Sequence, residues 1–261
     1  MVKRVSVERL RRCKESGEPI CCLTAYDASM AQLAEDAGVE LLLVGDSVGM
    51  TMLGFDSTVA VTLAMMIHHA AAVVRGRRRA WVVVDLPFGS YQHSPQQAYA
   101  SAVELIQQSG CDAVKLEGGG IMVETIRFLA ERGVAVVAHL GLLPQSIGRL
   151  GSYSRQATDR EGAERLLRDG VAVAAAGAVA VVLESIPAQL AAEVTERLPI
   201  PTIGIGAGAS CDGQVLVWHD LLGLSPVNPP FAPAYCDLRT QISAAVTKWC
   251  SDVRQHRYPQ E

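Results

Sequence analysis

The sequence predicts an α/β protein built as a closed (β/α)8 barrel, and three observations lead to this prediction. Seven or eight apolar runs of strand length alternate with helical segments along the 261 residues, as in parallel sheets with crossover helices. The connections between these segments are short, and no linker interrupts them. Hydrophobic residues make up 49% of the chain and aromatic residues only 5%, which suits close packing of helices on strands. We therefore expect a single barrel domain over residues 1–261.

Each predicted strand is a continuous apolar run, which is typical of strands that are covered on both faces. The first seven runs are rich in Val, Ile or Leu, and the eighth is weaker. The predicted strands are Ile20–Thr24, Leu41–Val44, Trp81–Asp85, Ala113–Glu117, Val134–His139, Ala178–Glu184, Pro201–Ile205 and Val215–Trp218. An open, doubly wound sheet is the alternative, but no G-x-G-x-x-G motif follows the first strand.

The predicted helices follow the strands, and most end at a glycine, the residue that most readily closes a helix. One of them opens with Ser94 as its cap and Pro95 in its first turn, and closes at Gly110. An extra N-terminal helix, Ser6–Glu15, is expected to cross the bottom of the barrel. The other predicted helices are Ala28–Ala37, Leu63–Arg75, Met122–Arg132, Asp159–Ala176, Pro187–Arg197 and Asp237–Val253.

Charge and cysteine content narrow the class of protein. The formal net charge of −4 argues against binding to nucleic acid, and we interpret the basic run Arg75–Arg79 as a solvated helix end. Seven cysteines without a C-x-x-C pair predict neither a disulfide framework nor a structural zinc site. The polar N-terminus is unlike a signal peptide, and no apolar run approaches the roughly 20 residues of a membrane span. We expect a cytoplasmic protein with no membrane or nucleic-acid partner.

Polar residues end five consecutive predicted strands, namely Asp46, Asp85, Glu117, His139 and Glu184. In a barrel, the carboxyl ends of the strands converge on one mouth, where catalysis takes place. Lys115 lies two residues before Glu117, so both side chains are expected to point to the same side of their strand. The sequence therefore predicts a polar site at the barrel mouth.

Four carboxylates in one pocket repel one another unless a cation lies between them. Mg²⁺ binds oxygen ligands and typically uses one or two protein carboxylates, and the absence of a Cys or multi-His cluster argues against zinc. Structural roles are the alternative: Asp46 and Asp85 as helix caps, Lys115 and Glu117 as an ion pair, and His139 as a core histidine. Their common position at strand ends favours a metal-dependent carboxylate site.

The glycine-rich segment Gly204–Gln214, "GIGAGASCDGQ", follows the seventh predicted strand. Such a loop can hold a phosphate through its backbone N–H groups, or it can form a tight turn that brings backbone close to a substrate. It lacks the G-K-[ST] sequence of a P-loop, which favours the tight turn.

These residues and their neighbours resemble the ketopantoate (3-methyl-2-oxobutanoate) hydroxymethyltransferase family. The resemblance runs in order from about residue 20 to 220, and the matching segments are "LTAYDASMA", "LLLVGDSVGMTMLGFDST", "DLPFGSY", "AVKLEGG", "HLGLLPQS", "VVLESIP" and "IGIGAGASCDGQVLVWHD". It implies a TIM barrel of the phosphoenolpyruvate mutase/isocitrate lyase type, assembled as a homo-oligomer, usually a decamer. It also implies transfer of a hydroxymethyl group from 5,10-methylenetetrahydrofolate to 3-methyl-2-oxobutanoate, giving 2-dehydropantoate for pantothenate biosynthesis.

The resemblance also implies roles for individual residues. The Mg²⁺ ligands would be Asp46 and Asp85, with Glu117 as a third ligand, direct or through water. Substrate contacts would come from these two aspartates, Ser47 and Lys115. The catalytic residues would be Glu184 as general base, Lys115 as a fixed cation beside the developing oxyanion, and His139 to orient either a carboxylate or the substrate acid.

Three segments depart from the pattern of the family, at residues 64–68, 154–157 and 230–233. They leave two alternatives open. The first is a paralogue that keeps the metal and the fold but acts as a lyase or aldolase on a 2-oxo or 2-hydroxy acid. The second is a non-catalytic paralogue with an assembly or regulatory role. Turnover of 3-methyl-2-oxobutanoate that depends on folate would distinguish the hydroxymethyltransferase from both.

Overall fold

The structure is a computed structural model that describes residues 4–259. Its internal contacts divide the chain into two compact units, Met1–Val215 and Leu216–Glu261, and each unit is described here by itself. The single domain that the sequence predicts over residues 1–261 stays a prediction.

The first unit contains a closed barrel of parallel strands in which each strand pairs with the next one along the chain. The backbone N–H of Ile20 donates to the carbonyl of Asp212 (2.9 Å) and links the first strand to the segment before the last. The predicted (β/α)8 barrel is confirmed. Its strands are β1 Ile20–Thr24, β2 Leu41–Val44, β3 Trp81–Asp85, β4 Ala113–Glu117, β5 Val136–Gly141, β6 Ala180–Glu184, β7 Thr202–Ile205 and β8 Gly213–Leu216.

The eighth strand begins two residues earlier than the sequence predicts, at Gly213 instead of Val215. Gly213 and Gln214 pair with β7, and a Cβ on Gly213 would lie 2.6 Å from the carbonyl oxygen of Ile20. Glycine is therefore required by a close approach of backbone, which an apolar pattern does not signal. The fifth strand is displaced in the other direction, because it continues to Gly141, which pairs with Glu184.

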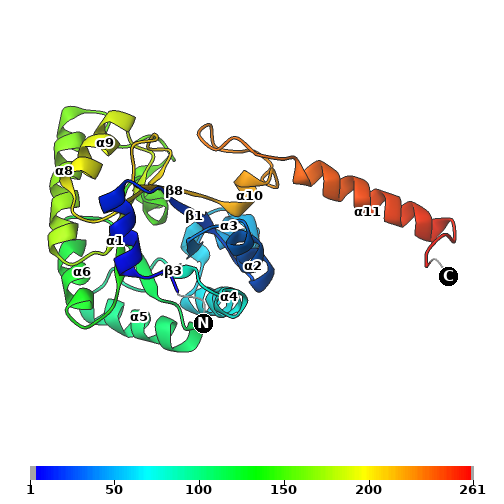
Figure 1. The fold of residues 1–261 in the computed structure, drawn as a ribbon, viewed down its shortest axis with the longest axis horizontal. Coiled ribbons are helices and arrows are strands. Elements are labelled where there is room, and N and C mark those ends of the chain that lie inside the picture. The colour runs from blue at the N-terminus through cyan, green and yellow to red at the C-terminus, as the bar shows by residue number, and fades with distance from the viewer. Residues whose placement is uncertain (1–3, 260–261) are drawn as a thin grey trace. The chain divides into compact units, whose positions relative to one another are not determined.

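Helices of the first unit surround the barrel, and neighbours along the chain pack on one another: α2 on α4, α4 on α5, α5 on α6, α6 on α8 and α8 on α9 (Figure 1). The predicted N-cap Ser94 is confirmed, because its hydroxyl oxygen accepts from the N–H of Gln97 (3.1 Å). The long helices are α1 Val7–Ser16, α2 Ala28–Asp36, α4 Leu63–Gly76, α5 Pro95–Ser109, α6 Met122–Ala130, α8 Arg160–Ala175 and α9 Ala188–Arg197. Short turns that the sequence does not predict are α3 Val48–Thr51, η1 Thr58–Ala60, η2 Pro144–Ser146 and α7 Ile147–Leu150.

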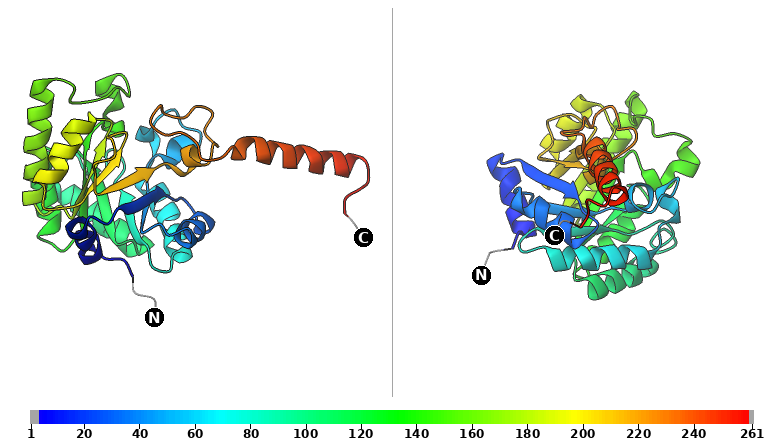
Figure 2. Two further views of the ribbon diagram at one scale, coloured as in Figure 1. Left: turned by 45° about the horizontal axis from the view of Figure 1, so that its top comes forward. Right: turned by 90° about the vertical axis from the view of Figure 1, so that its right-hand side faces the viewer.

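The predicted N-terminal helix is present as α1, seen in dark blue in Figure 2. Its buried residues Leu10 and Cys13 belong to the same core cluster as Ile20, Leu41 and Trp81, which lie at the amino ends of their strands. The helix therefore closes the barrel at the end opposite to the carboxyl ends of the strands. The same cluster continues up the inside of the barrel through Val83, Ala113, Val137, Ala180, Val182 and Ile203.

Two sequence features have structural roles. Arg77, from the basic run, is buried, and it pairs with Asp112 and donates to the carbonyls of Ala80 (3.0 Å) and Gly110 (3.1 Å). The interpretation of this residue as solvated is therefore wrong, because an arginine fork can satisfy several carbonyls at once. The glycine-rich segment Gly204–Gln214 is tightly packed, because a Cβ on Gly208 would lie 2.5 Å from the Ala188 side chain.

The second unit consists of the short helix α10 Trp218–Leu221, an irregular segment and the long helix α11 Leu238–Arg254. The segment folds back on α10, because the N–H of Tyr235 donates to the carbonyl of Leu221 (2.8 Å). Asp237 caps α11 by accepting from the N–H of Thr240 (3.1 Å). In the described part of the chain, no helix is both long and apolar enough to cross a membrane.

Candidate active site

The five polar residues predicted at strand ends come together at the mouth of the barrel, around Lys115. Lys115 pairs in register with Asp85 on β3 and with Val137 on β5, and Glu117 pairs with His139. Below this level the inward positions are apolar. The side chains that point inward are therefore apolar along most of each strand and polar at its carboxyl end, and the polar ones form a layer at the mouth.

Lys115 is the cation at the centre of this layer. Its ammonium lies 2.9 Å from Asp85 Oδ1 and donates to His139 Nδ1 at 3.3 Å. Burial by itself lowers the pKa of Lys115, but the charges of Asp85, Glu117 and Asp46 outweigh burial, and the net effect raises the pKa. Lys115 is therefore a permanent positive charge, held in place by the acids around it.

His139 lies between the lysine and two carboxylates. Its Nε2 is 3.1 Å from Glu184 Oε2, and its Nδ1 is 3.6 Å from Glu117 Oε1. Burial and the charge of Lys115 lower the pKa of His139, so the ring is neutral near pH 7. Of the two roles that the sequence leaves open for His139, this position favours orienting a carboxylate, Glu184.

Asp46 is the second residue after β2, following Gly45, and lies beside Asp85. Its backbone N–H donates to Asp85 Oδ2 at 3.0 Å. Asp46 is only 4% exposed, and burial together with the charge of Asp85 raises its pKa to about 7. Burial likewise raises the pKa of Glu117 well above its usual range. Both shifts arise first from burial, and the charge of Asp85 adds to the shift of Asp46.

Ser47 and Tyr26 complete this side of the mouth. The Ser47 hydroxyl lies 2.8 Å from the Tyr26 hydroxyl, and Ser47 immediately precedes α3. A Cβ on Gly45 would lie 2.8 Å from Ser47 Oγ. Glycine at this position therefore lets the chain turn sharply after β2 and presents Asp46 and Ser47 together.

Glu184 ends β6 and is the most open of the predicted acids, with 17% of its side chain exposed. Its backbone is held firmly: its carbonyl accepts from the N–H of Leu142 (2.8 Å), and the next residue, Ser185, donates its N–H to Ile205 (2.8 Å). Ser185 has a φ of +47°, a conformation that non-glycine residues rarely adopt. The side chain thus stands at the mouth on a fixed backbone.

Gln145 and Tyr91 are site residues that reasoning from the sequence did not find. Gln145 Nε2 donates to Asp46 Oδ2 (2.8 Å), and its backbone N–H donates to Glu117 Oε2 (3.1 Å). The Tyr91 hydroxyl donates to Gln145 Oε1 (2.7 Å). The available signal was the position of "LPQS" directly after β5, in a loop at the mouth, but a neutral amide does not stand out there.

The predicted metal ligands are tested by where their oxygen atoms lie. Among the described residues, only Cys13, Glu18 and Glu40 bring three potential ligand atoms within 4.8 Å of one another, and there Arg9 pairs with both glutamates. The carboxylate oxygens of Asp46, Asp85 and Glu117 do not all lie within this distance of one another. Asp85 Oδ1 is buried, and its partner is the Lys115 ammonium 2.9 Å away, in a pair that lacks good hydrogen-bond geometry. The donor set fits a hard cation that takes one or two carboxylates and fills its other positions with water and substrate.

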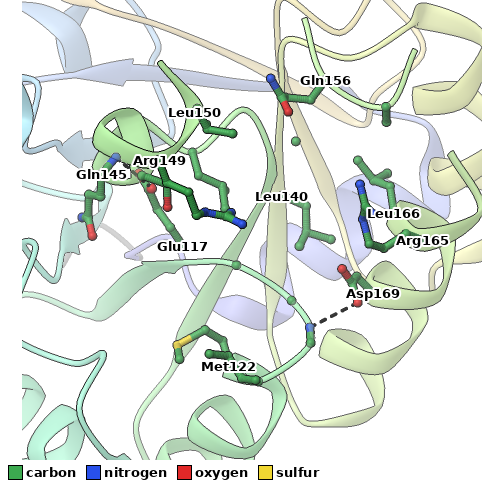
Figure 3. A pocket seen from close by; sticks show the side chains of 18 of the residues that line it. Glu117, Met122, Leu140, Gln145, Arg149, Leu150, Gln156, Arg165, Leu166 and Asp169 are labelled. Carbon is green, nitrogen blue, oxygen red and sulfur yellow. Dashed lines mark hydrogen bonds between the residues drawn. The ribbon is translucent and has the colours of Figure 1, made fainter. Parts of the chain in front are cut away.

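The four acids at the mouth, Asp46, Asp85, Glu117 and Glu184, form an acid layer. A cavity of about 740 Å³ opens beside this layer. Figure 3 shows Glu117 and Gln145 at one side of it, Arg149 projecting inward from α7, and Arg165 and Asp169 on α8 across from them. Asp169 Oδ1 accepts from the N–H of Gly120 at 3.1 Å, which links α8 to the loop that follows β4. The cavity is large enough for a second organic substrate next to the predicted reaction centre.

Comparison with solved structures supports the fold. A phosphoenolpyruvate phosphomutase from Streptomyces platensis subsp. rosaceus matches with a TM-score of 0.64 at 16% identity, over 97% of this chain and 88% of the other. A 2,3-dimethylmalate lyase, described as a PEP mutase/isocitrate lyase superfamily member, matches with a TM-score of 0.61 at 17% identity, over 100% and 91%. The chain thus shares its barrel fold with these two proteins, which agrees with the predicted fold class.

Comparison of sequences identifies the family. The model of the family described as ketopantoate hydroxymethyltransferase matches residues 4–261. A 3-methyl-2-oxobutanoate hydroxymethyltransferase from Acaryochloris marina (strain MBIC 11017) is 53% identical over 257 residues, which cover 98% of this chain and 99% of the relative. One of the same name from Synechocystis sp. (strain ATCC 27184 / PCC 6803 / Kazusa) is 54% identical over 247 residues, covering 94% and 95%. The chain therefore belongs to the ketopantoate hydroxymethyltransferase family and is an enzyme of this type.

Proposed function

We propose that this enzyme transfers a hydroxymethyl group from 5,10-methylenetetrahydrofolate to 3-methyl-2-oxobutanoate by Mg²⁺-assisted enolisation, giving 2-dehydropantoate and tetrahydrofolate. One carbon comes from the folate, and water supplies the oxygen of the new hydroxyl group. The observation that carries the proposal is the layer of buried acids around Lys115 at the barrel mouth. A site with an excess of negative charge is suited to a divalent cation and to a substrate that binds through that cation.

In this proposal, Asp46 and Asp85 hold Mg²⁺, with Glu117 as a third ligand, direct or through water. Burial and, after it, the charge of Asp85 raise the pKa of Asp46 to about 7, and a bound cation would favour the ionised form of this carboxylate. When bound, Mg²⁺ supplies Lewis-acid stabilisation of the negative charge that develops on the 2-oxo acid.

The remaining residues act on the substrate. Glu184, the most exposed acid of the layer, removes the proton from C3 as general base. His139 keeps the Glu184 carboxylate in orientation through their 3.1 Å contact. Lys115 is the fixed cation beside the developing oxyanion, and Ser47, with Asp46 and Asp85, contributes to substrate binding.

The cavity beside Glu117 and Gln145 is the proposed site of the folate. Arg149, near Gln145, and Arg165, across from it, both line this cavity, and two guanidinium groups match the carboxylates of a folate glutamate tail. We expect Arg165→Ala to raise the KM for methylenetetrahydrofolate without changing proton exchange at C3 of the oxo acid. Arg168→Ala, on the same helix but outside the cavity lining, is the control. An unchanged folate KM in Arg165→Ala would remove this assignment.

Proton exchange at C3 of 3-methyl-2-oxobutanoate in deuterated water tests the reaction. The proposal expects exchange that requires Mg²⁺, and 2-dehydropantoate only when methylenetetrahydrofolate is also present. Mg²⁺-dependent exchange without any folate-dependent product would favour the lyase or aldolase alternative. No exchange under saturating Mg²⁺ would favour the non-catalytic alternative.

The proposal extends to the oligomeric state, the cellular compartment and the pathway of the enzyme. We infer a homo-oligomer, a decamer by resemblance to the family, in the cytoplasm and in pantothenate biosynthesis. All seven cysteines are free thiols, which suits a reducing compartment. The second unit offers an apolar stripe on α11 that suits contact with another copy, formed by Ile242, Val246, Trp249 and Val253. Sedimentation velocity of the purified protein measures the subunit number.

A further inference from the structure

We propose that Gln145, held by Tyr91, is a positioning residue that fixes the orientation of the Asp46 and Glu117 carboxylates at the barrel mouth. The inference rests on the proposed function, in which these acids serve a bound Mg²⁺. Gln145 is 4% exposed, and it contacts both acids through two different groups. Its side-chain amide reaches Asp46 Oδ2 (2.8 Å), and its backbone N–H reaches Glu117 Oε2 (3.1 Å).

Every polar group of the Gln145 side chain has a partner. Nε2 donates to Asp46 Oδ2 and to the carbonyl of Leu86 (2.9 Å). Oε1 accepts from the Tyr91 hydroxyl (2.7 Å) and from Gln92 Nε2 (3.1 Å). An amide has two donor hydrogens and one acceptor oxygen with two lone pairs, so this side chain is fully used, and none of it remains to bind substrate.

The surrounding backbone determines which way the amide points. The Leu86 carbonyl can only accept, so it requires Nε2 on its side. The N–H of Glu117 donates to the Tyr91 hydroxyl (3.1 Å), which directs the hydroxyl proton of Tyr91 toward Gln145 Oε1. The N–H of Gly89 donates to Gln92 Oε1 (2.7 Å), which leaves Gln92 Nε2 to face Gln145. A rotated amide would oppose donor to donor and acceptor to acceptor, so Asp46 always meets an N–H.

The local fold explains why the backbone N–H of Gln145 is available. Gln145 lies in the 3-10 turn Pro144–Ser146, which follows β5. The first N–H groups of a helical turn have no partner within the turn, and here the carboxylate of Glu117 provides one. One oxygen of Asp46 and one of Glu117 are thereby occupied, and the second oxygen of each carboxylate is left for the reaction centre. Partners of this kind typically change metal affinity by about 10–100-fold.

Calorimetric titration of the protein with Mg²⁺ tests the inference without relying on activity. Gln145→Met removes both polar ends of the amide while keeping an unbranched side chain and the backbone N–H. We expect it to weaken Mg²⁺ binding about 10–100-fold. Tyr91→Phe should weaken binding in the same direction but less, and should add little when combined with Gln145→Met, because both act through the same hydrogen bond. Gln108→Met, on the exposed face of α5, is the matched control and should bind as the wild type does.

The outcomes separate the inference from the proposed function. If Asp46→Asn abolishes Mg²⁺ binding while Gln145→Met and Tyr91→Phe bind like the wild type, the positioning role is wrong and the metal site stands. Fully additive losses in the double variant would also overturn the shared role of the two residues. If the wild type itself shows neither Mg²⁺ binding nor C3 exchange, the proposed function fails, and this inference fails with it. Circular dichroism identifies a Gln145→Met protein that does not fold, in which case Tyr91→Phe decides.

Discussion

At the scale of single residues, Asp46 shows what it costs to hold acids together before a ligand arrives. A carboxylate in a buried site next to Asp85 is less stable in its charged form than in water, and its pKa is accordingly raised to about 7. The hydrogen bond from Gln145 offsets only part of this cost. A cation that binds between these acids lowers the free energy of the site, because it reduces the repulsion between their charges.

Replacing Asp46 by Asn should therefore stabilise the metal-free protein while weakening Mg²⁺ binding. Because the folded pKa exceeds the unfolded one, the wild type binds a proton more tightly when folded, and its stability falls as the pH rises from about 4 to 7. Asp46→Asn lacks this loss, which amounts to at most about 4 kcal/mol. Melting temperatures at pH 5 and pH 8 in a chelator measure it.

The control for this experiment is Asp56→Asn, an exposed aspartate outside the acid layer. It should follow the wild type at both pH values. If Asp46→Asn loses as much stability between pH 5 and pH 8 as the wild type does, Asp46 is not the strained acid. Unchanged Mg²⁺ affinity in the same variant would count against Asp46 as a ligand.

Glu184 is the residue whose loss should affect chemistry more than binding. Glu184→Gln keeps the shape of the side chain but removes the base, so we expect kcat to fall by roughly 10²–10⁴ with Mg²⁺ and oxo-acid affinity nearly unchanged. Glu193→Gln, on α9 and paired with Arg197, is the control. Near-normal deuterium exchange at C3 in Glu184→Gln would show that another group takes the proton.

Residue types at strand ends could be predicted from the sequence, and their partners could not. Asp85, Glu117 and His139 follow from the periodicity of β strands combined with barrel closure. Gln145 contacts Asp46 although the two residues are 99 positions apart in the chain. Such a contact depends on the exact course of a loop. A neutral amide in a loop also has no charge or periodicity that would predict the contact from the sequence.

At the scale of elements, the carboxyl ends of β5 and β6 act together to hold the proposed base. Gly141 at the end of β5 pairs with Glu184 at the end of β6, and the N–H of Leu142 donates to the Glu184 carbonyl (2.8 Å). Gly141 has a φ of +95°, and a Cβ placed on it would lie 2.2 Å from that carbonyl oxygen. The backbone under Glu184 can approach this closely only because a glycine faces it.

Gly141→Ala should therefore displace the Glu184 backbone. The strained φ alone costs about 1–3 kcal/mol, and a shift of about 1 Å at the reaction centre can lower the rate roughly 10²-fold. C3 exchange and thermal unfolding measure the two effects. Gly148→Ala is the matched control, because a Cβ there meets no atom within 4 Å. Wild-type exchange in Gly141→Ala would mean that the two strand ends do not fix the base.

The same elements show where sequence patterns succeed and where they lose resolution. All eight strands were predicted within two residues of their observed bounds, because continuous apolar runs mark strands that are buried on both faces. The start of the eighth strand was missed by two residues, because it begins with Gly213 and Gln214, which carry no apolar signal. The short turns η2 and α7 were not predicted, although η2 contains Gln145, since three or four residues are too few to establish a period.

At the scale of the whole molecule, barrel closure is what turns a repeating pattern into a site. Each of the βα units of β2 to β6 contributes one or two of these polar residues, and none of these units would form the acid layer alone. Closure brings β2 through β6 around one mouth, so residues from Asp46 to Glu184 meet although 138 positions separate them in the sequence. The second unit contributes none of the predicted site residues.

The second unit instead presents a surface suited to assembly. All residues of α11 are described, and none of them is buried. Ile242, Val246, Trp249 and Val253 are exposed and recur at intervals of three and four, which places them on one face of the helix. An apolar stripe of this kind on a long helix is typical of a surface that another chain covers.

Val246→Glu should therefore reduce the mass of the proposed homo-oligomer, because it introduces a charge into the middle of the stripe, where desolvation would oppose association. Ala244→Glu is the control, since the helical period places Ala244 on the opposite side of α11, and it should assemble as the wild type does. Sedimentation velocity measures both masses, and C3 exchange reports whether the barrel still works. If Val246→Glu keeps the wild-type mass, or if the wild type is itself a monomer, the stripe does not serve assembly.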